Sequence, residues 1–122
     1  MQQKILSEGI NFNKMPYIYW SDRLKASCLQ RQIIVHSILY YHLSENVISD
    51  VYFDNLGRQL MSLREQMSEN EYKRTEYYYC FDDFDGTTGF YLYDALTTKD
   101  RKYLTSVAKS VLRQYKRERI GG

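Results

Sequence analysis

The residues best suited to catalysis lie in one acidic loop. Asp83 and Asp85 stand two positions apart, Gly86 and Thr87 follow at once, and an apolar aromatic run, 77–81, precedes them. Two carboxylates at this spacing could attack a phosphate ester and carry its proton, with Mg²⁺ screening the phosphate charge. The spacing also suits the start of a calcium loop, but no glutamate follows at the distance that would complete one.

This Asp-x-Asp-Gly-Thr pattern looks like the nucleophile loop of haloacid-dehalogenase-type phosphatases. Those enzymes also need a distant lysine and a further acidic pair on an α/β sheet, and too few residues follow Asp85 to build one. We therefore interpret the loop as an acidic turn whose Asp side chains accept hydrogen bonds from backbone N–H groups. His36 and His42 lie six residues apart, on different faces of a helix, and no nucleophile pairs with either. The sequence predicts no catalytic residue, no metal site and no enzyme.

The elements that must position any site are helices, because proline and glycine are sparse and apolar residues recur at helical spacing. We predict a mainly α fold built on a helical hairpin, about 22–43 and 49–67, joined by a short turn. Ser21 and Ser49 are the expected N-caps of the two helices. The expected buried stripes are Leu24, Cys28, Ile33 or Ile34, Ile38 and Tyr41 in the first helix, and Val51, Tyr52, Leu56, Leu60, Leu63 and Met67 in the second.

A C-terminal helix, about 98–117, completes the predicted single domain of residues 1–122. Thr97 or Thr98 caps it, and an irregular connector from residue 68 onward, with aromatic and acidic stretches, leads to it. A short helix is expected within 90–96. Residues 1–14 lack a period, and we interpret the aromatic run 15–20 as a hydrophobic lead-in.

Composition favours a protein of the cytoplasm. No signal peptide and no long apolar run is present, so we expect no membrane association. Cys28 and Cys80 fit neither a metal pattern nor a disulfide framework, so both are expected as reduced thiols.

The hairpin carries the most specific pattern in the chain: Leu39-Tyr40-Tyr41, a short turn, then Ile48-Ser49-Asp50 followed by Phe53-Asp54 and Leu56. Residues 36–67 resemble the N-terminal helical domain, called Ia, of NAD-dependent DNA ligases. In that family the domain clamps the nicotinamide mononucleotide half of NAD. The resemblance implies a nucleotide-binding site at Tyr40, Tyr41, Asp50, Phe53 and Asp54.

The chemistry of these side chains suits that ligand. An aromatic ring can stack on the cationic nicotinamide, and carboxylates at a helix start can accept hydrogen bonds from ribose hydroxyls or the carboxamide. Phe53 stands where the family has Tyr, so one hydroxyl is missing. The Lys-x-Asp-Gly motif of the ligase reaction is also absent, so the chain is not a complete ligase. The expected cofactor is none, with NAD or nicotinamide mononucleotide as the alternative.

Stand-alone versions of this domain look like small proteins encoded by bacteriophages. The resemblance therefore implies a phage accessory protein in the host cytoplasm. Small phage proteins of this size are often inhibitors of host defence, including CRISPR systems. A host defence complex is thus a second expected partner, and an interaction with protein alone, through the aromatic surface, remains open.

The last helix is the second candidate site, because charge is unevenly spread. From Lys99 onward eight basic residues face two acids, which leaves the tail with a net charge of +6 while the whole chain carries +2. Such a helix can contact phosphates while Tyr rings stack on unpaired bases. We expect RNA or single strands rather than duplex DNA as the ligand, held by Lys102, Lys109, Arg113, Lys116 and Arg117. Nucleic-acid binding is therefore the first hypothesis for function, and nicotinamide-nucleotide binding is the alternative.

Overall fold

The structure, a computed structural model, describes residues 20–86 and 88–121, with side chains through Arg119, and every regular element in those ranges is helical. The long helices are α2 (Asp22–His42), α3 (Asp50–Gln66) and α6 (Thr98–Gly121). The short ones are α4 (Glu69–Tyr72), the 3₁₀ turn η3 (Tyr78–Cys80) and α5 (Leu92–Ala95). The predicted mainly α fold is confirmed. The predicted lead-in lies outside the described residues except for Trp20, which is buried.

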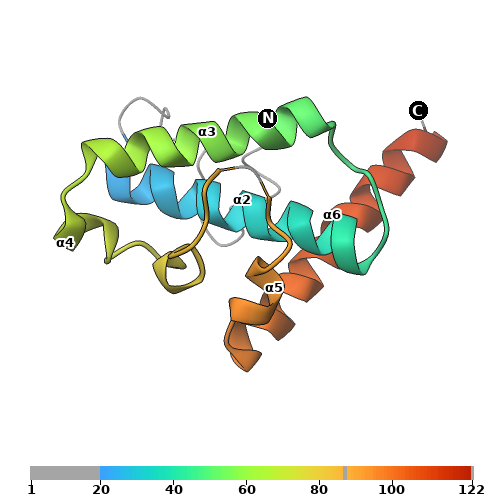
Figure 1. Cartoon of the computed structure of the whole chain (residues 1–122). Coiled ribbons are helices and arrows are strands. Elements are labelled where there is room, and N and C mark those ends of the chain that lie inside the picture. The colour runs from blue at the N-terminus through green and yellow to red at the C-terminus, as the bar shows by residue number, and fades with distance from the viewer. Residues whose placement is uncertain (1–19, 87, 122) are drawn as a thin grey trace.

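α2 is the central helix, and α3, α4, α5 and α6 all contact it (Figure 1). Its middle and C-terminal part is buried on every face, as far as Leu39. The buried side chains include four polar ones, Gln30, Gln32, His36 and Ser37. Because this part of α2 has no solvent face, these polar groups need partners inside the protein. Tyr41, which we expected on the buried stripe, is exposed because α2 leaves the core in its last turn.

α3 runs antiparallel to α2, as the predicted hairpin requires (Figure 1). Both predicted N-caps are confirmed: the Ser21 hydroxyl accepts from the Leu24 N–H and the Ser49 hydroxyl from the Tyr52 N–H, each at 3.1 Å. The expected burial of Val51 and Tyr52 is wrong, since Val51 is 67% exposed. Burial in α3 begins one turn later, at Leu56, where the helix meets the apolar middle of α2.

The connector after α3 is fixed to α2 by the side chain of Gln30. Its amide nitrogen donates to the Thr75 hydroxyl at 2.9 Å and to the Tyr72 hydroxyl at 3.3 Å, and its carbonyl accepts from the Tyr77 N–H at 2.9 Å. This fully buried amide therefore has partners on both of its polar atoms. The stretch that we predicted as irregular also holds α4, whose first turn is capped by Ser68.

Arg101 joins α5 to α6. Its guanidinium donates to the carbonyls of Tyr93, Asp94 and Leu96 at 3.1, 3.2 and 2.9 Å, so it satisfies the C-terminal end of α5. The Thr97 hydroxyl accepts from the Asp100 N–H at 3.2 Å and caps α6, which extends past the predicted end at 117. The predicted apolar stripe of α6 is buried at Leu104, Val107, Ala108 and Val111. In the described ranges, no helix has the length and apolar character needed to cross a membrane.

Gly57 lets the acidic loop lie directly on α3. A Cβ at Gly57 would stand 2.3 Å from the carbonyl oxygen of Gly86, which itself has a φ of 92°. A side chain at position 57 would have to displace backbone rather than a flexible side chain. The loop that we singled out for its acids therefore packs closely against the hairpin.

We expect Gly57→Ala to lower the free energy of unfolding by about 1–3 kcal/mol, because the added methyl group overpacks this contact. Helix propensity alone predicts that Gly57→Ala raises the free energy of unfolding. Ser62→Ala, at an exposed position of the same helix, is the matched control and should be neutral or slightly stabilising. Urea denaturation of the three proteins measures both effects, and a Gly57→Ala protein as stable as the wild type would contradict the close contact.

Candidate functional site

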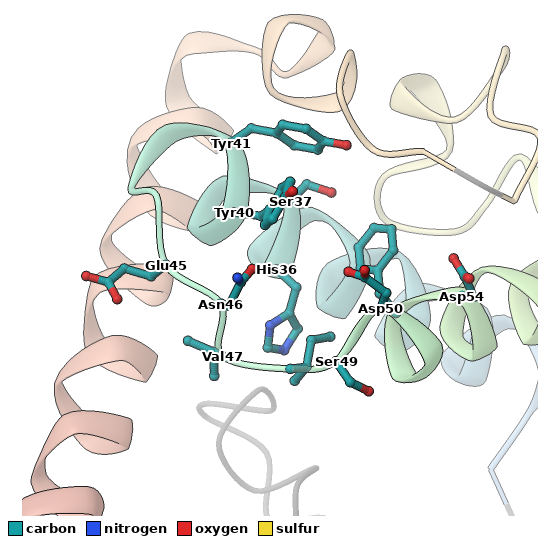
Figure 2. Close-up of a pocket in the computed structure, with 12 residues that line it drawn as sticks. His36, Ser37, Tyr40, Tyr41, Glu45, Asn46, Val47, Ser49, Asp50 and Asp54 are labelled. Atoms are coloured by element: carbon teal, nitrogen blue, oxygen red, sulfur yellow. The ribbon is translucent and has the colours of Figure 1, made fainter.

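A cavity of about 300 Å³ opens at the turn of the hairpin, between the end of α2 and the start of α3 (Figure 2). Its walls come from the last two turns of α2, from residues 45–49 of the turn and from the first two turns of α3. A volume of this size lies at the lower end of the range of small-molecule sites. The cavity is thus built by the segment that carries the most specific sequence pattern.

The turn has its shape because α2 ends in a left-handed residue. Ser44 has a φ of 56°, and the backbone N–H groups of Leu43 and Glu45 donate to the carbonyls of Ile38 and Leu39 at 3.0 and 2.8 Å. These bonds satisfy carbonyls that the helix end would leave without partners. The chain then reverses and enters α3 at the Ser49 cap, which brings the two helix ends to face one another.

All five residues of the predicted nucleotide site line this one cavity. Two rings from α2, Tyr40 and Tyr41, stand across from the α3 side chains of Asp50 and Asp54 (Figure 2), and Phe53 of α3 lines the same cavity. The two tyrosines are exposed at the mouth, whereas Phe53 is partly buried. The structure therefore brings together the residues that the ligase resemblance identified, from two helices and across the turn between them.

The cavity is acidic. Glu45, Asp50 and Asp54 contribute three carboxylates, and no Lys or Arg occurs among the described residues that line it. Carboxylates and aromatic faces both attract cations. The lining thus favours a ligand with a positively charged ring over one that places an anion in the cavity.

Two polar residues of the cavity wall were missed by the sequence interpretation, which treated His36 only as a catalytic candidate. His36 is 9% exposed and Ser37 is 2% exposed, so they are the deepest residues of the lining. His36 Nδ1 and Ser37 Oγ find no hydrogen-bond partner among the described residues. Burial lowers the pKa of His36 to about 4, so its imidazole is neutral at pH 7. No pattern in the sequence marks either residue as part of a site. A buried His or Ser in a helix usually has a hydrogen-bond partner, and the sequence does not show when that partner is missing.

Aromatic rings continue from the mouth of the cavity onto the 88–91 segment. The Tyr41 ring packs edge-to-face on Tyr40 and on Phe90, with centroids 4.8 and 5.3 Å apart, and Phe90 packs on Tyr91 at 5.0 Å. The Tyr41 hydroxyl also lies 3.2 Å from the Thr88 hydroxyl oxygen. These contacts hold Tyr41 in place at the entrance.

Among the described residues, none from α6 lines the cavity, but the basic face of α6 reaches the edge of the cavity at Lys116. All five residues predicted to bind nucleic acid are exposed: Lys102, Lys109, Arg113, Lys116 and Arg117. The ammonium group of Lys116 lies 3.4 Å from a carboxylate oxygen of Glu45, which lines the cavity. Arg101, which we counted in the basic tail, is instead used to cap α5.

The acidic loop shows no such convergence. Asp83 and Asp85 are exposed, and within residues 20–86 and 88–121 no three His, Cys, Asp or Glu side chains stand close enough to hold a metal ion. Both cysteines are free thiols; Cys28 is partly buried and Cys80 is buried, and burial raises the pKa of Cys80 to about 11.

The pKa of His36 makes the stability of the protein depend on pH. Between pH 6.5 and 4 the unfolded chain binds a proton on His36 and the folded chain does not, so stability falls as pH falls. We expect His36 to account for a loss of about 2 kcal/mol between pH 7 and 4.5. His36→Leu removes this part of the loss. Urea denaturation of both proteins at the two pH values tests this, and equal losses in both would contradict it.

Comparison with known proteins adds no relative: no family model matches the chain, and no curated protein or solved structure matches it. The ligand of the cavity is therefore inferred from the residues that line it.

Proposed function

We propose that this protein is a binding module for a nicotinamide nucleotide, either the free mononucleotide or the corresponding half of NAD. One observation carries the proposal: Tyr40, Tyr41, Asp50, Phe53 and Asp54, chosen from the ligase resemblance, line a single cavity. They come from two helices, α2 and α3, on either side of the turn.

The chemistry of the cavity supports this ligand. The pyridinium ring of nicotinamide is a planar cation, which suits the aromatic rings and the three carboxylates of the wall. Asp50 and Asp54 stand at the start of α3, nearer to solvent than His36, where they can accept hydrogen bonds from ribose hydroxyls. We propose binding rather than catalysis, because His36 Nδ1 and Ser37 Oγ are not hydrogen-bonded to each other as a base and its nucleophile would be.

We expect nicotinamide mononucleotide at millimolar concentration to raise the melting temperature of the protein by several degrees, because a ligand that binds only the folded state stabilises it. Asp50→Asn should reduce this shift, since it removes one carboxylate from the cavity. Differential scanning fluorimetry over a ligand titration measures both effects.

Asp22→Asn is the matched control for that experiment. Asp22 is also the first residue of a helix capped by serine, yet it does not line the cavity. Asp22→Asn should leave the ligand-induced shift in melting temperature unchanged. It should destabilise its helix end about as much as Asp50→Asn destabilises the start of α3. A wild-type protein with no shift at millimolar ligand would rule the proposed function out.

We propose nucleic-acid binding by α6 as a second function. It is favoured by the exposure of five basic side chains on one helix, of which only Lys116 is ion-paired among the described residues. Phosphate contacts from such a face need no base-specific geometry, and single-stranded RNA would also offer bases to the exposed rings of Tyr40 and Tyr91. An accessory role in a phage, including inhibition of a CRISPR complex, stays a prediction of the ligase resemblance.

Replacing Lys109, Arg113 and Lys116 by Gln should weaken binding to single-stranded RNA and lower the slope of log affinity against log salt by about 2, since each lost phosphate contact accounts for about 0.7. Fluorescence anisotropy at several salt concentrations measures the slope. The charge-matched control replaces Arg23, Lys73 and Arg74, which are exposed elsewhere. Equal affinity and slope in both triple variants would show that α6 is not the binding face.

A further inference from the structure

The cavity lining offers no cation to the phosphate of a nucleotide. Its described residues include the carboxylates of Glu45, Asp50 and Asp54 but no Lys or Arg. A phosphate monoester carries a charge of about −1.5 to −2 at pH 7, so these carboxylates repel it. The cationic ring of the proposed ligand suits the cavity, whereas its phosphate needs a cation from beyond the cavity wall.

A cation from α6 already contacts the cavity wall from outside. The ammonium nitrogen of Lys116 lies 3.4 Å from a carboxylate oxygen of Glu45, whose side chain points toward α6 (Figure 2). The side chain of Lys116 is 54% exposed and that of Glu45 is 34% exposed, so water screens this ion pair and keeps it weak. Because the lysine side chain is long and flexible, its ammonium group can exchange the carboxylate for a more highly charged anion.

Arg58 of α3 is a second cation near the cavity, one helical turn from Asp54. Its guanidinium donates to Asn55 Oδ1 at 2.6 Å. Arg58 also lines a separate cavity, whose described lining includes the carboxylates of Asp54, Glu65 and Asp85. Negative charge therefore exceeds positive charge around Arg58, and this surroundings disfavours a phosphate there.

We propose that Lys116 binds the phosphate of the nicotinamide nucleotide and leaves Glu45 to do so. Arg113 and Arg117 are exposed on the same helix within one turn of Lys116, so the phosphate meets a basic surface rather than a single charge. Glu45 competes with the ligand, because it holds the ammonium group in the free protein. This inference rests on the proposed nicotinamide function and adds a residue of α6 to that site.

Isothermal titration calorimetry of the full chain with nicotinamide mononucleotide and nicotinamide riboside tests the inference, because the two ligands differ only in the phosphate. Lys116→Gln should weaken mononucleotide binding by about 3- to 10-fold and change riboside binding by less than about 2-fold. Lys116 is exposed and its ion pair is weak, so the variant should keep the wild-type melting temperature. A purely structural role of Lys116 would not separate the two ligands.

Glu45→Gln should raise the ratio of mononucleotide affinity to riboside affinity by about 3- to 10-fold. It releases Lys116 and removes a negative charge near the phosphate, while the cationic ring loses the same carboxylate in both ligands. When Lys116→Gln is added to Glu45→Gln, this rise should be smaller, since part of it depends on the ammonium group.

Arg58→Gln is the matched control. It removes an exposed cation of α3 that also lies near the cavity, yet it should leave the affinities for both ligands within about 2-fold of the wild type. The comparison with Lys116→Gln separates a specific phosphate contact from the general effect of lowering the positive charge of the protein.

The outcomes separate this inference from the proposed function. Mononucleotide affinity lost in Lys116→Gln, with riboside affinity retained, supports it. Equal changes for both ligands in that variant, wild-type affinity for both, or a phosphate-dependent loss of the same size in Arg58→Gln overturns it and leaves the proposed function standing. A wild-type chain that does not bind the mononucleotide overturns both.

Discussion

The complete burial of the middle of α2 is the constraint on which the rest of the structure depends. A helix that is covered on every side must pair its polar side chains with groups of the surrounding segments. Gln30 does so through three hydrogen bonds, and these bonds attach the connector between α3 and α5 to the core. His36 and Ser37, less than two turns further along, are also buried, but His36 Nδ1 and Ser37 Oγ have no partner among the described residues. The same constraint thus ties the connector to α2 at Gln30 and leaves two buried polar atoms near the end of α2 without a partner in the described ranges.

The hairpin turn forms a cavity at this end of α2. Ser44 adopts the left-handed conformation that ends α2, and Ser49 starts α3 only a few residues later, so the two helix ends stand across a short, curved segment. Because burial in α3 begins only at Leu56, its first turn is free to present carboxylates to the cavity rather than apolar side chains to the core. Val51 lies in this first turn and is exposed, contrary to our prediction, because α3 meets the core only from Leu56 onward.

The sequence predicted the long helices within a few residues, because their caps and apolar periods are local signals. It also singled out Tyr40, Asp50 and Asp54, whose spacing across a single turn places them on one cavity, while their role in nucleotide binding stays a prediction. It could not predict that His36 and Ser37 line the cavity with polar atoms that lack partners in the described ranges, because a missing hydrogen-bond partner is a property of the packed structure. The roles of Arg101 and Gly57 were hidden for a similar reason, because each depends on where backbone carbonyls lie in the packed structure: those of the α5 segment for Arg101 and that of Gly86 for Gly57.

Charge divides the surface near the site into two parts that meet at one ion pair. The cavity wall is acidic and α6 is basic, and the bond between Glu45 and Lys116 lies on their border. Lys116 is more than half exposed, so this pair contributes little to stability and its ammonium group can change partner at small cost. A nicotinamide nucleotide has the matching polarity, with a cationic ring at one end and a phosphate at the other. In the proposed complex, a phosphate that leaves the cavity on the Glu45 side would meet Lys116, so the residue proposed to bind nucleic acid would also serve the nucleotide site.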